Sequence, residues 1–263
     1  GAVNNKRPDR AVIKYTNLIR KYFKNTKPIV LGGIEASLRR ITHYDYWSNK
    51  LRKPILFDAK ADFLVYGMAE KATLKLAETL ATGQNPKHIR GLCYISKSAI
   101  DNYIELPDWR EVNRDKAKFI EMFRLFYENT DPVNADGLIQ KIDNRYWVQN
   151  PPEDYLTEQE MSGVYSLKFE REAHPAYRDK IRALDTIQFS VPTHRGCYGE
   201  CNFCAIAVHE GTRVRWRPEA SITGEIKDMT THRNWKGYVS DLCGPTANMY
   251  GFECDHKLKH GKC

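Results

Sequence analysis

The stretch Cys197-Tyr198-Gly199-Glu200-Cys201-Asn202-Phe203-Cys204 places three thiols at spacings of four and three residues in one short loop. Thiolates are the soft, anionic ligands that iron-sulfur clusters require, and Gly196 and Gly199 let the backbone fold closely around inorganic sulfide. Three local ligands leave one iron of a four-iron cluster open to an exogenous chelating ligand. The stretch therefore predicts a 4Fe-4S cluster on Cys197, Cys201 and Cys204.

Structural zinc is the alternative interpretation of these thiols, because zinc also binds Cys and His side chains. His194 or His209 could supply a fourth ligand. A compact three-cysteine cluster directly after a strand is less typical of zinc than paired Cys-x-x-Cys motifs. A non-catalytic zinc module, with a basic surface able to bind RNA, remains the second hypothesis.

The composition describes a globular chain that can bury a sizeable core. Its 263 residues suit one large domain or two smaller ones, and no stretch approaches the ~20 apolar residues of a membrane-spanning helix. The net charge of +8 comes from scattered basic residues, which favours an ordinary solvated surface over a nucleic-acid groove. Seven cysteines, three of them crowded into eight residues, are unlike a secreted disulfide framework. We therefore expect a cytoplasmic protein with no membrane partner.

Hydrophobic patterning divides the chain into regions 1–100, 101–182 and 183–263. In the first, apolar residues at helical spacing over 12–22 precede the apolar run 29–31, which ends at Gly32-Gly33. A second run, 63–66, ends at Gly67 and is followed by a helical pattern over 74–80, and 89–95 can supply another strand. This alternation predicts a parallel α/β sheet.

The other two regions differ in pattern. Region 101–182 predicts a connector with a helix at 111–127, and its clearest break is Asn150-Pro151-Pro152-Glu153. Region 183–263 predicts a strand at 186–191, the cysteine loop, a helix at 221–231 capped by Ser221, and a strand at 237–242. The last region therefore forms one β-loop-α-β unit.

Several segments carry a family resemblance that spans nearly the whole chain. The cysteine loop has the pattern Cys-x-x-x-Cys-x-aromatic-Cys after a strand, and the other matching segments are 6–11, 30–40, 43–47, 148–152, 194–197 and 244–248. The chain resembles the radical S-adenosylmethionine superfamily and, within it, the little-characterised YgiQ-type family.

The resemblance implies a Rossmann-like (cobalamin-binding-like) N-terminal region that misses its first strand, followed by the start of a radical SAM partial (β/α) barrel. It implies that S-adenosylmethionine chelates the open iron and is cleaved reductively to a 5′-deoxyadenosyl radical that abstracts hydrogen from an unknown substrate. By the same analogy, the backbone at Phe203 faces adenine, and Gly244, Pro245 and Thr246 lie near the methionine moiety. Cobalamin itself is not expected, because the Asp-x-His-x-x-Gly motif is absent.

The resemblance also implies an electron donor such as flavodoxin or ferredoxin. The ~80 residues after Ala183 are too few for a complete barrel, so we expect this chain to be inactive alone. No catalytic residue is assigned beyond the cluster.

Two further sets of residues allow alternative readings. Cys243, Cys254 and Cys263 could form part of a second metal site with His256 or His260, although their spacing is looser than that of usual metal motifs. Arg213, Arg215 and Arg217 alternate with Val214 and Trp216, a pattern that fits an anionic-substrate surface and a solvated strand face equally well.

Overall fold

The computed structural model describes residues 8–246 and 249–261 and divides the chain into two compact units. Unit 1 runs to Asp154 and also includes His260, and unit 2 covers Tyr155–Lys259. The division falls one residue after the Asn150-Pro151-Pro152-Glu153 segment. No helix in the described part of the chain is long and apolar enough to cross a membrane.

Unit 1 is an α/β fold, which confirms the predicted class. Its helices are α1 (Ala11–Tyr22), α2 (Gly33–Leu38), α3 (Ile55–Ala59), α4 (Glu70–Ala81), the 3-10 helix η1 (Pro86–His88), α5 (Trp109–Val112) and α6 (Lys116–Glu128). Its strands are β1 (Val30–Leu31), β2 (His43–Asp45), β3 (Lys50–Arg52), β4 (Phe63–Val65), β5 (Leu92–Ser96), β6 (Ile104–Leu106), β7 (Leu138–Ile142) and β8 (Arg145–Gln149).

The central sheet is mixed, which corrects the expectation of a parallel one. Its six strands lie in the order β1-β4-β5-β8-β7-β6. Only β1 with β4 and β6 with β7 pair in parallel, while the other three pairings are antiparallel. The β1–β4 pair with its intervening helices is the Rossmann-like element. One reason for the difference is the two-residue turn between Ile142 and Arg145, where Asp143 adopts a φ of 57° and reverses the chain into a hairpin.

The middle of the chain belongs to this sheet, although its sequence predicts a connector. Strands β6, β7 and β8 lie within 104–149 and supply half of the six strands. The predicted helix at 111–127 is divided into α5 and α6. Asp115 ends the connection between them by accepting a hydrogen bond from the Ala117 amide as the N-cap of α6.

The two faces of the sheet have different chemistry. One face is an apolar core in which Ala72 and Leu76 of α4 pack with Leu92, Ile139 and Val148. The opposite face is mixed, because Gln140, Trp147 and Gln149 on β7 and β8 are buried there beside Leu138 and Ile142. Alternation of side chains along a strand places these two sets on opposite sides.

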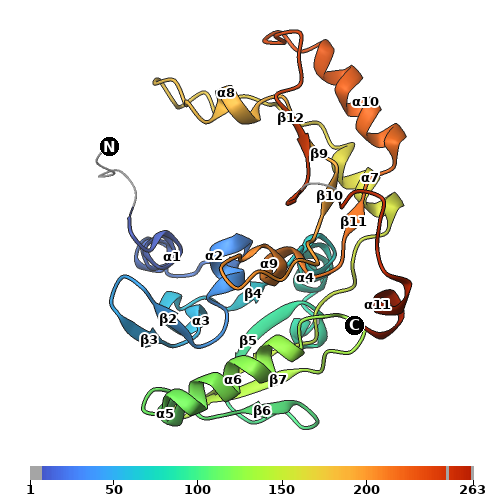
Figure 1. Cartoon of the computed structure of the whole chain (residues 1–263). Coiled ribbons are helices and arrows are strands. Elements are labelled where there is room, and N and C mark those ends of the chain that lie inside the picture. The colour runs from blue at the N-terminus through green and yellow to red at the C-terminus, as the bar shows by residue number, and fades with distance from the viewer. Residues whose placement is uncertain (1–7, 247–248, 262–263) are drawn as a thin grey trace. The chain divides into compact units, whose positions relative to one another are not determined.

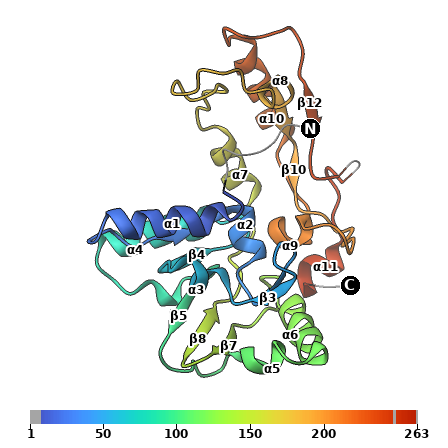
Figure 2. The ribbon, with the colours of Figure 1, turned by 90° about the vertical axis from the view of Figure 1, so that its left-hand side faces the viewer.

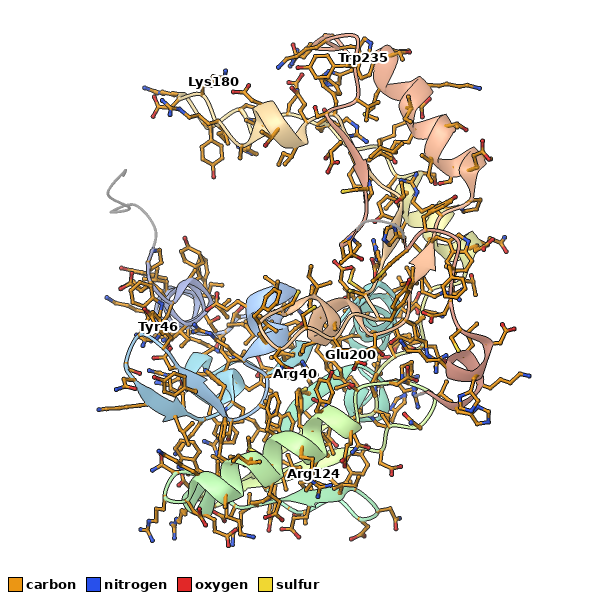
Figure 3. All side chains as sticks on the ribbon, viewed as in Figure 1. Arg40, Tyr46, Arg124, Lys180, Glu200 and Trp235 are labelled. Carbon is orange, nitrogen blue, oxygen red and sulfur yellow. The ribbon has the colours of Figure 1, made fainter. Side chains whose placement is uncertain are left out.

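A buried arginine covers this second face of the sheet. The Arg40 guanidinium donates to Gln149 Oε1 at 2.8 Å and to the Ser37 carbonyl at 2.5 Å. It lies between the rings of Tyr66 and Phe126, with its Cζ 4.4 and 4.5 Å from their centroids. Figure 3 labels Arg40 beside α6. Hydrogen bonds of Arg40 therefore help to hold the segment after α2 to the sheet.

Unit 2 contains the predicted β-loop-α-β unit. Its helices are α7 (Glu158–Tyr165), α8 (Leu184–Ile187), α9 (Ile206–Glu210), α10 (Glu219–Thr230) and α11 (Asp255–His260), the last residue of which is assigned to unit 1. Its strands are β9 (Ser190–Pro192), β10 (His194–Arg195), β11 (Arg215–Trp216) and β12 (Asp241–Cys243). β9 and β12 pair in parallel, and α10 packs beside β9 (Figures 1 and 2).

Three local predictions for this unit differ from the structure, one of them being the strand predicted at 237–242, which spans only Asp241–Cys243. Residues Leu184–Ile187 form α8, so the strand begins only at Ser190, where Phe189 starts a buried cluster with Val191 and Ile222. Ser221 does not cap α10, since the helix starts after Pro218 and the Ser221 hydroxyl instead accepts from Arg217 Nε at 3.2 Å. Proline at a helix start replaces the polar cap.

The β2–β3 hairpin carries a buried carboxylate, Asp45, that makes acid stability testable. Burial opposes its ionisation, but hydrogen bonds from Ser48 and Arg10 outweigh burial and lower the pKa of Asp45 to about 2. The unfolded value is about 3.9. Stabilisation by this carboxylate is therefore present above that value and is lost as the pH falls through 2.

We expect the thermal unfolding midpoint of this chain to fall between about pH 5 and pH 2 more steeply than that of an Asp45→Asn variant, measured by circular dichroism. Asp101→Asn alters an exposed residue and should keep the wild-type pH dependence. Identical slopes for wild type and Asp45→Asn would contradict the assignment.

Candidate metal centre

The predicted cluster loop and the predicted cosubstrate loop leave the same edge of unit 2. In the β9–β12 pair, Pro192 lies opposite Cys243, and the Thr193 amide donates to the Cys243 carbonyl at 2.9 Å. The cysteine loop follows β9 through β10, and Gly244 follows β12 directly. The carboxyl ends of parallel strands are where open α/β sheets bind ligands.

The start of the cysteine loop is clamped by the returning chain. The Gly196 amide donates to Glu210 Oε2 at 2.9 Å, and the Cys197 amide donates to the Gly211 carbonyl at 3.1 Å. Gly196 has a φ of 82°, and a Cβ added to it would lie 1.9 Å from the Arg213 carbonyl oxygen. Glycine is therefore required at this position by both backbone conformation and close approach.

Two of the three predicted thiols lie around Gly199. The Gly199 amide donates to Cys197 Sγ at 3.4 Å, and Cys201 Sγ lies 3.8 Å from the Gly199 carbonyl oxygen. A Cβ on Gly199 would approach these two sulfurs at 3.3 and 3.7 Å. Cys197 is buried, whereas Cys201 is exposed. Gly199 thus forms a cradle that leaves room beside two sulfurs.

The third thiol lies at the end of a second turn in the same loop. The Cys204 amide donates to the Cys201 carbonyl at 2.9 Å, and the Cys204 side chain is half-buried. Within residues 8–246 and 249–261, no three His, Cys, Asp or Glu side chains are gathered closely enough to hold a single metal ion.

The other predicted cosubstrate residues are only partly brought together. Phe203 projects into solvent, with 93% of its surface exposed. Gly244 lies against the ring of His194, and the Thr246 hydroxyl donates to Met249 Sδ at 2.8 Å. The cysteine loop and the Gly244–Thr246 loop therefore start from the same end of the β9–β12 pair. The exposed Phe203 side chain packs against neither loop.

His194, one alternative zinc ligand, has a different role in the structure. Its Nδ1 lies 2.9 Å from the Thr193 hydroxyl, and its ring faces Gly244. Burial lowers the pKa of His194, against the opposing influence of the Thr246 backbone and the Glu210 carboxylate. The neutral ring is therefore part of the packing between two loops. His209, the other alternative ligand, lies at the end of α9.

The predicted second metal site is not assembled in the described part of the chain. Cys243 is exposed and donates its thiol hydrogen to Asp241 Oδ2 at 3.1 Å, a contact that raises the pKa of Cys243. Cys254 lies just before α11, whose residues include His256 and His260. Cys263 lies outside the described residues.

The three alternating arginines are engaged with the protein. Arg213 Nη1 donates to the Leu258 carbonyl at 2.9 Å, and Arg215 Nε donates to the Leu156 carbonyl at 3.1 Å. The Arg217 side chain is 1% exposed and pairs with Glu225 at 2.5 Å. Arg217 is thus neither a solvated residue nor an anion-binding one, because Glu225 already occupies its guanidinium. The sequence pattern did not indicate this partner.

The α/β fold and the three-cysteine loop define the class to which the chain belongs. Residues 1–190 match the family model described as Radical SAM N-terminal, and the chain belongs to that family. The predicted resemblance to the radical S-adenosylmethionine superfamily and its YgiQ-type family is thereby confirmed.

Relatives of this chain carry the family name UPF0313. A UPF0313 protein of Fusobacterium nucleatum subsp. nucleatum is 57% identical over 100% of this chain and 47% of its own length. A UPF0313 protein of Thermotoga maritima is 44% identical over the same shares of the two chains. The chain spans about half the length of the curated relatives it matches.

A solved structure also resembles this chain. The radical S-adenosylmethionine methyltransferase TsrM from Kitasatospora setae, with a tryptophan substrate and a SAM analogue bound, aligns with 83% of this chain and 30% of its own at 17% identity. The TM-score of this alignment is 0.43.

Proposed function

We propose that the cysteine loop of this chain holds a 4Fe-4S cluster, and that the whole protein is an enzyme that cleaves S-adenosylmethionine reductively to act on a substrate still to be identified. The observation that carries the proposal is the loop itself. Three thiols lie within the eight-residue loop that follows β9 and β10, and Gly199 leaves space beside two of their sulfurs. Family membership supports the same chemistry.

The donor set fits such a cluster. Cys197, Cys201 and Cys204 would be the three ligands, and the Gly199 amide, which already donates to Cys197 Sγ, would stabilise negative charge on that sulfur. When bound, the cluster supplies the electron that breaks a sulfur-carbon bond of S-adenosylmethionine and so yields a 5′-deoxyadenosyl radical. Glu210 and Gly211 would hold the loop in position through the Gly196 and Cys197 amides.

The remaining chain would orient the cosubstrate. The backbone at Phe203 would meet the adenine, and Gly244, Pro245 and Thr246 would lie beside the methionine moiety, because both loops leave one strand edge. An electron donor such as flavodoxin or ferredoxin belongs to the proposal, as does a reducing, cytoplasmic setting that would protect reactive thiols.

Anaerobic reconstitution tests the proposal. We expect about four irons and four sulfides per chain, and an electron paramagnetic resonance signal in the dithionite-reduced protein that shifts when S-adenosylmethionine is added. Cys201→Ala should remove the signal. Cys93→Ala is the matched control, because Cys93 is a buried cysteine in β5 of unit 1 and is not one of the three proposed ligands.

Zinc uptake without sulfide would favour the second hypothesis, in which the loop belongs to a non-catalytic zinc module. One tightly held zinc per chain, with no iron retained and no signal in any variant, would leave a structural metal module and overturn the enzyme proposal.

A further inference from the structure

The side chain of His194 joins the two loops at the proposed cosubstrate edge. It stands three residues before Cys197, on β10, and its ring occupies the space beside Gly244. A Cβ added to Gly244 would lie 2.3–2.4 Å from the ring carbon Cε1 and both ring nitrogens. Only glycine fits beside this ring, so the position of the Gly244 loop depends on His194.

One atom of this ring lacks a partner. His194 is 3% exposed, and its Nε2 is buried with no hydrogen-bond partner in the described residues. The Thr246 backbone is close enough to the ring to oppose the lowering of the His194 pKa, but it does not reach Nε2 with hydrogen-bond geometry. A buried polar atom without a partner is costly, and a ligand that supplies the missing partner recovers that cost.

The hydrogen-bond partner of Nδ1 indicates whether Nε2 can donate or accept a hydrogen bond. Nδ1 lies 2.9 Å from the Thr193 hydroxyl, which can donate a hydrogen bond to it. In a neutral imidazole whose Nδ1 accepts, the hydrogen is on Nε2. With the Thr193 hydroxyl as the donor to Nδ1, the group that fits Nε2 is an acceptor, and a carboxylate makes the strongest bond with such a donor.

We propose that His194 Nε2 donates a hydrogen bond to the carboxylate of the amino-acid end of S-adenosylmethionine, and that its ring sets the position of the Gly244–Thr246 loop. This inference rests on the proposed function. It names a recognition residue that neither the cysteine motif nor the Gly244–Thr246 segment contains.

Binding of two ligands to the anaerobically reconstituted chain tests the inference. One is S-adenosylmethionine, and the other is 5′-methylthioadenosine, which lacks the amino-acid moiety. We expect His194→Ala to weaken S-adenosylmethionine binding by about ten- to a hundredfold, the effect of losing a hydrogen bond to a charged group. Binding of 5′-methylthioadenosine should change less than about twofold, within the scatter expected of a site that loses no contact.

Two replacements of His194 separate hydrogen bonding from packing. The amide nitrogen of glutamine can reach the position of Nε2, whereas that of asparagine lies near Nδ1. We expect His194→Gln to retain most of the affinity and His194→Asn to resemble His194→Ala. Iron content, measured for each variant, reports whether the loop itself remains intact.

Gly244→Ala provides an independent test of the packing. Because its methyl group overlaps the ring, the loss of affinity should be smaller when Gly244→Ala is made in the His194→Ala background. Equal losses in both backgrounds would contradict the contact.

The outcomes distinguish the two proposals. An iron-loaded His194→Ala variant that binds S-adenosylmethionine like wild type, or that loses both ligands equally, would overturn the role of His194 and leave the proposed function standing. Failure of the wild-type chain to assemble a cluster would overturn the proposed function, and this inference with it.

Discussion

Replacing Gly196 with alanine is expected to abolish cluster uptake by this chain. The added Cβ would lie 1.9 Å from the Arg213 carbonyl oxygen and 2.8 Å from its carbonyl carbon. Both are backbone atoms, so no side-chain rotation relieves the overlap. A φ of 82° adds about 1–2 kcal/mol for an L-residue. The loop must move. The hydrogen bonds that the Gly196 and Cys197 backbone amides donate to the Glu210–Gly211 segment should then be lost.

The measurement is iron and sulfide per chain after anaerobic reconstitution. Gly224→Ala is the matched control, because Gly224 lies inside α10 with no atom within 4 Å of an added Cβ. This control should bind a full cluster and gain up to ~1 kcal/mol of stability from better helix propensity. A full cluster in Gly196→Ala would show that the loop does not need the clamp.

Glu225→Ala should produce the largest loss of stability in unit 2. The carboxylate of Glu225 pairs with Arg217 through one oxygen and with Arg171 through the other. The Arg217 side chain is almost fully buried, and it also donates to the Pro192 carbonyl at 3.0 Å at the end of β9. Removing the carboxylate leaves a buried cation without its counter-charge, which typically costs about 3–5 kcal/mol.

Urea unfolding measures this loss, and an exposed ion pair on a helix gives the comparison. Arg124 and Glu128 of α6 pair at 3.1 Å with side chains 63% and 53% exposed. Solvent screens such a pair, so Glu128→Ala should cost less than ~1 kcal/mol. Losses of similar size in the two variants would mean that burial adds nothing to the Glu225 pairs.

The elements with strong local patterns were predicted well. Helices α1 and α4, strands β1, β4 and β5, and helix α10 lie where periodicity and glycine punctuation indicate. The hairpin β7–β8 was missed although a signal was present, since two runs rich in apolar and aromatic residues flank Asp143-Asn144. The connector interpretation gave more weight to the surrounding prolines than to this alternation.

The candidate site divides in the same way. The prediction of three cysteine ligands, with Gly196 before them and Gly199 between them, came from spacing and residue type, because thiolate chemistry and backbone freedom are local properties. The contact of His194 with Gly244 and the pairing of Arg217 with Glu225 could not be predicted, because each depends on packing between elements.

By itself, the sequence determined the amphipathic helices, the α/β class and the family of this protein, and it predicted the three cysteine ligands that the proposed function uses. Each of these depends on residue type and on spacing between near neighbours, which a chain carries whether or not it is folded. The tertiary structure decided the mixed strand order, the requirement for glycine at position 196 and the burial of Arg217. These features arise only when segments distant in the chain pack together, because strand pairing, steric overlap and loss of solvent are properties of the packed structure.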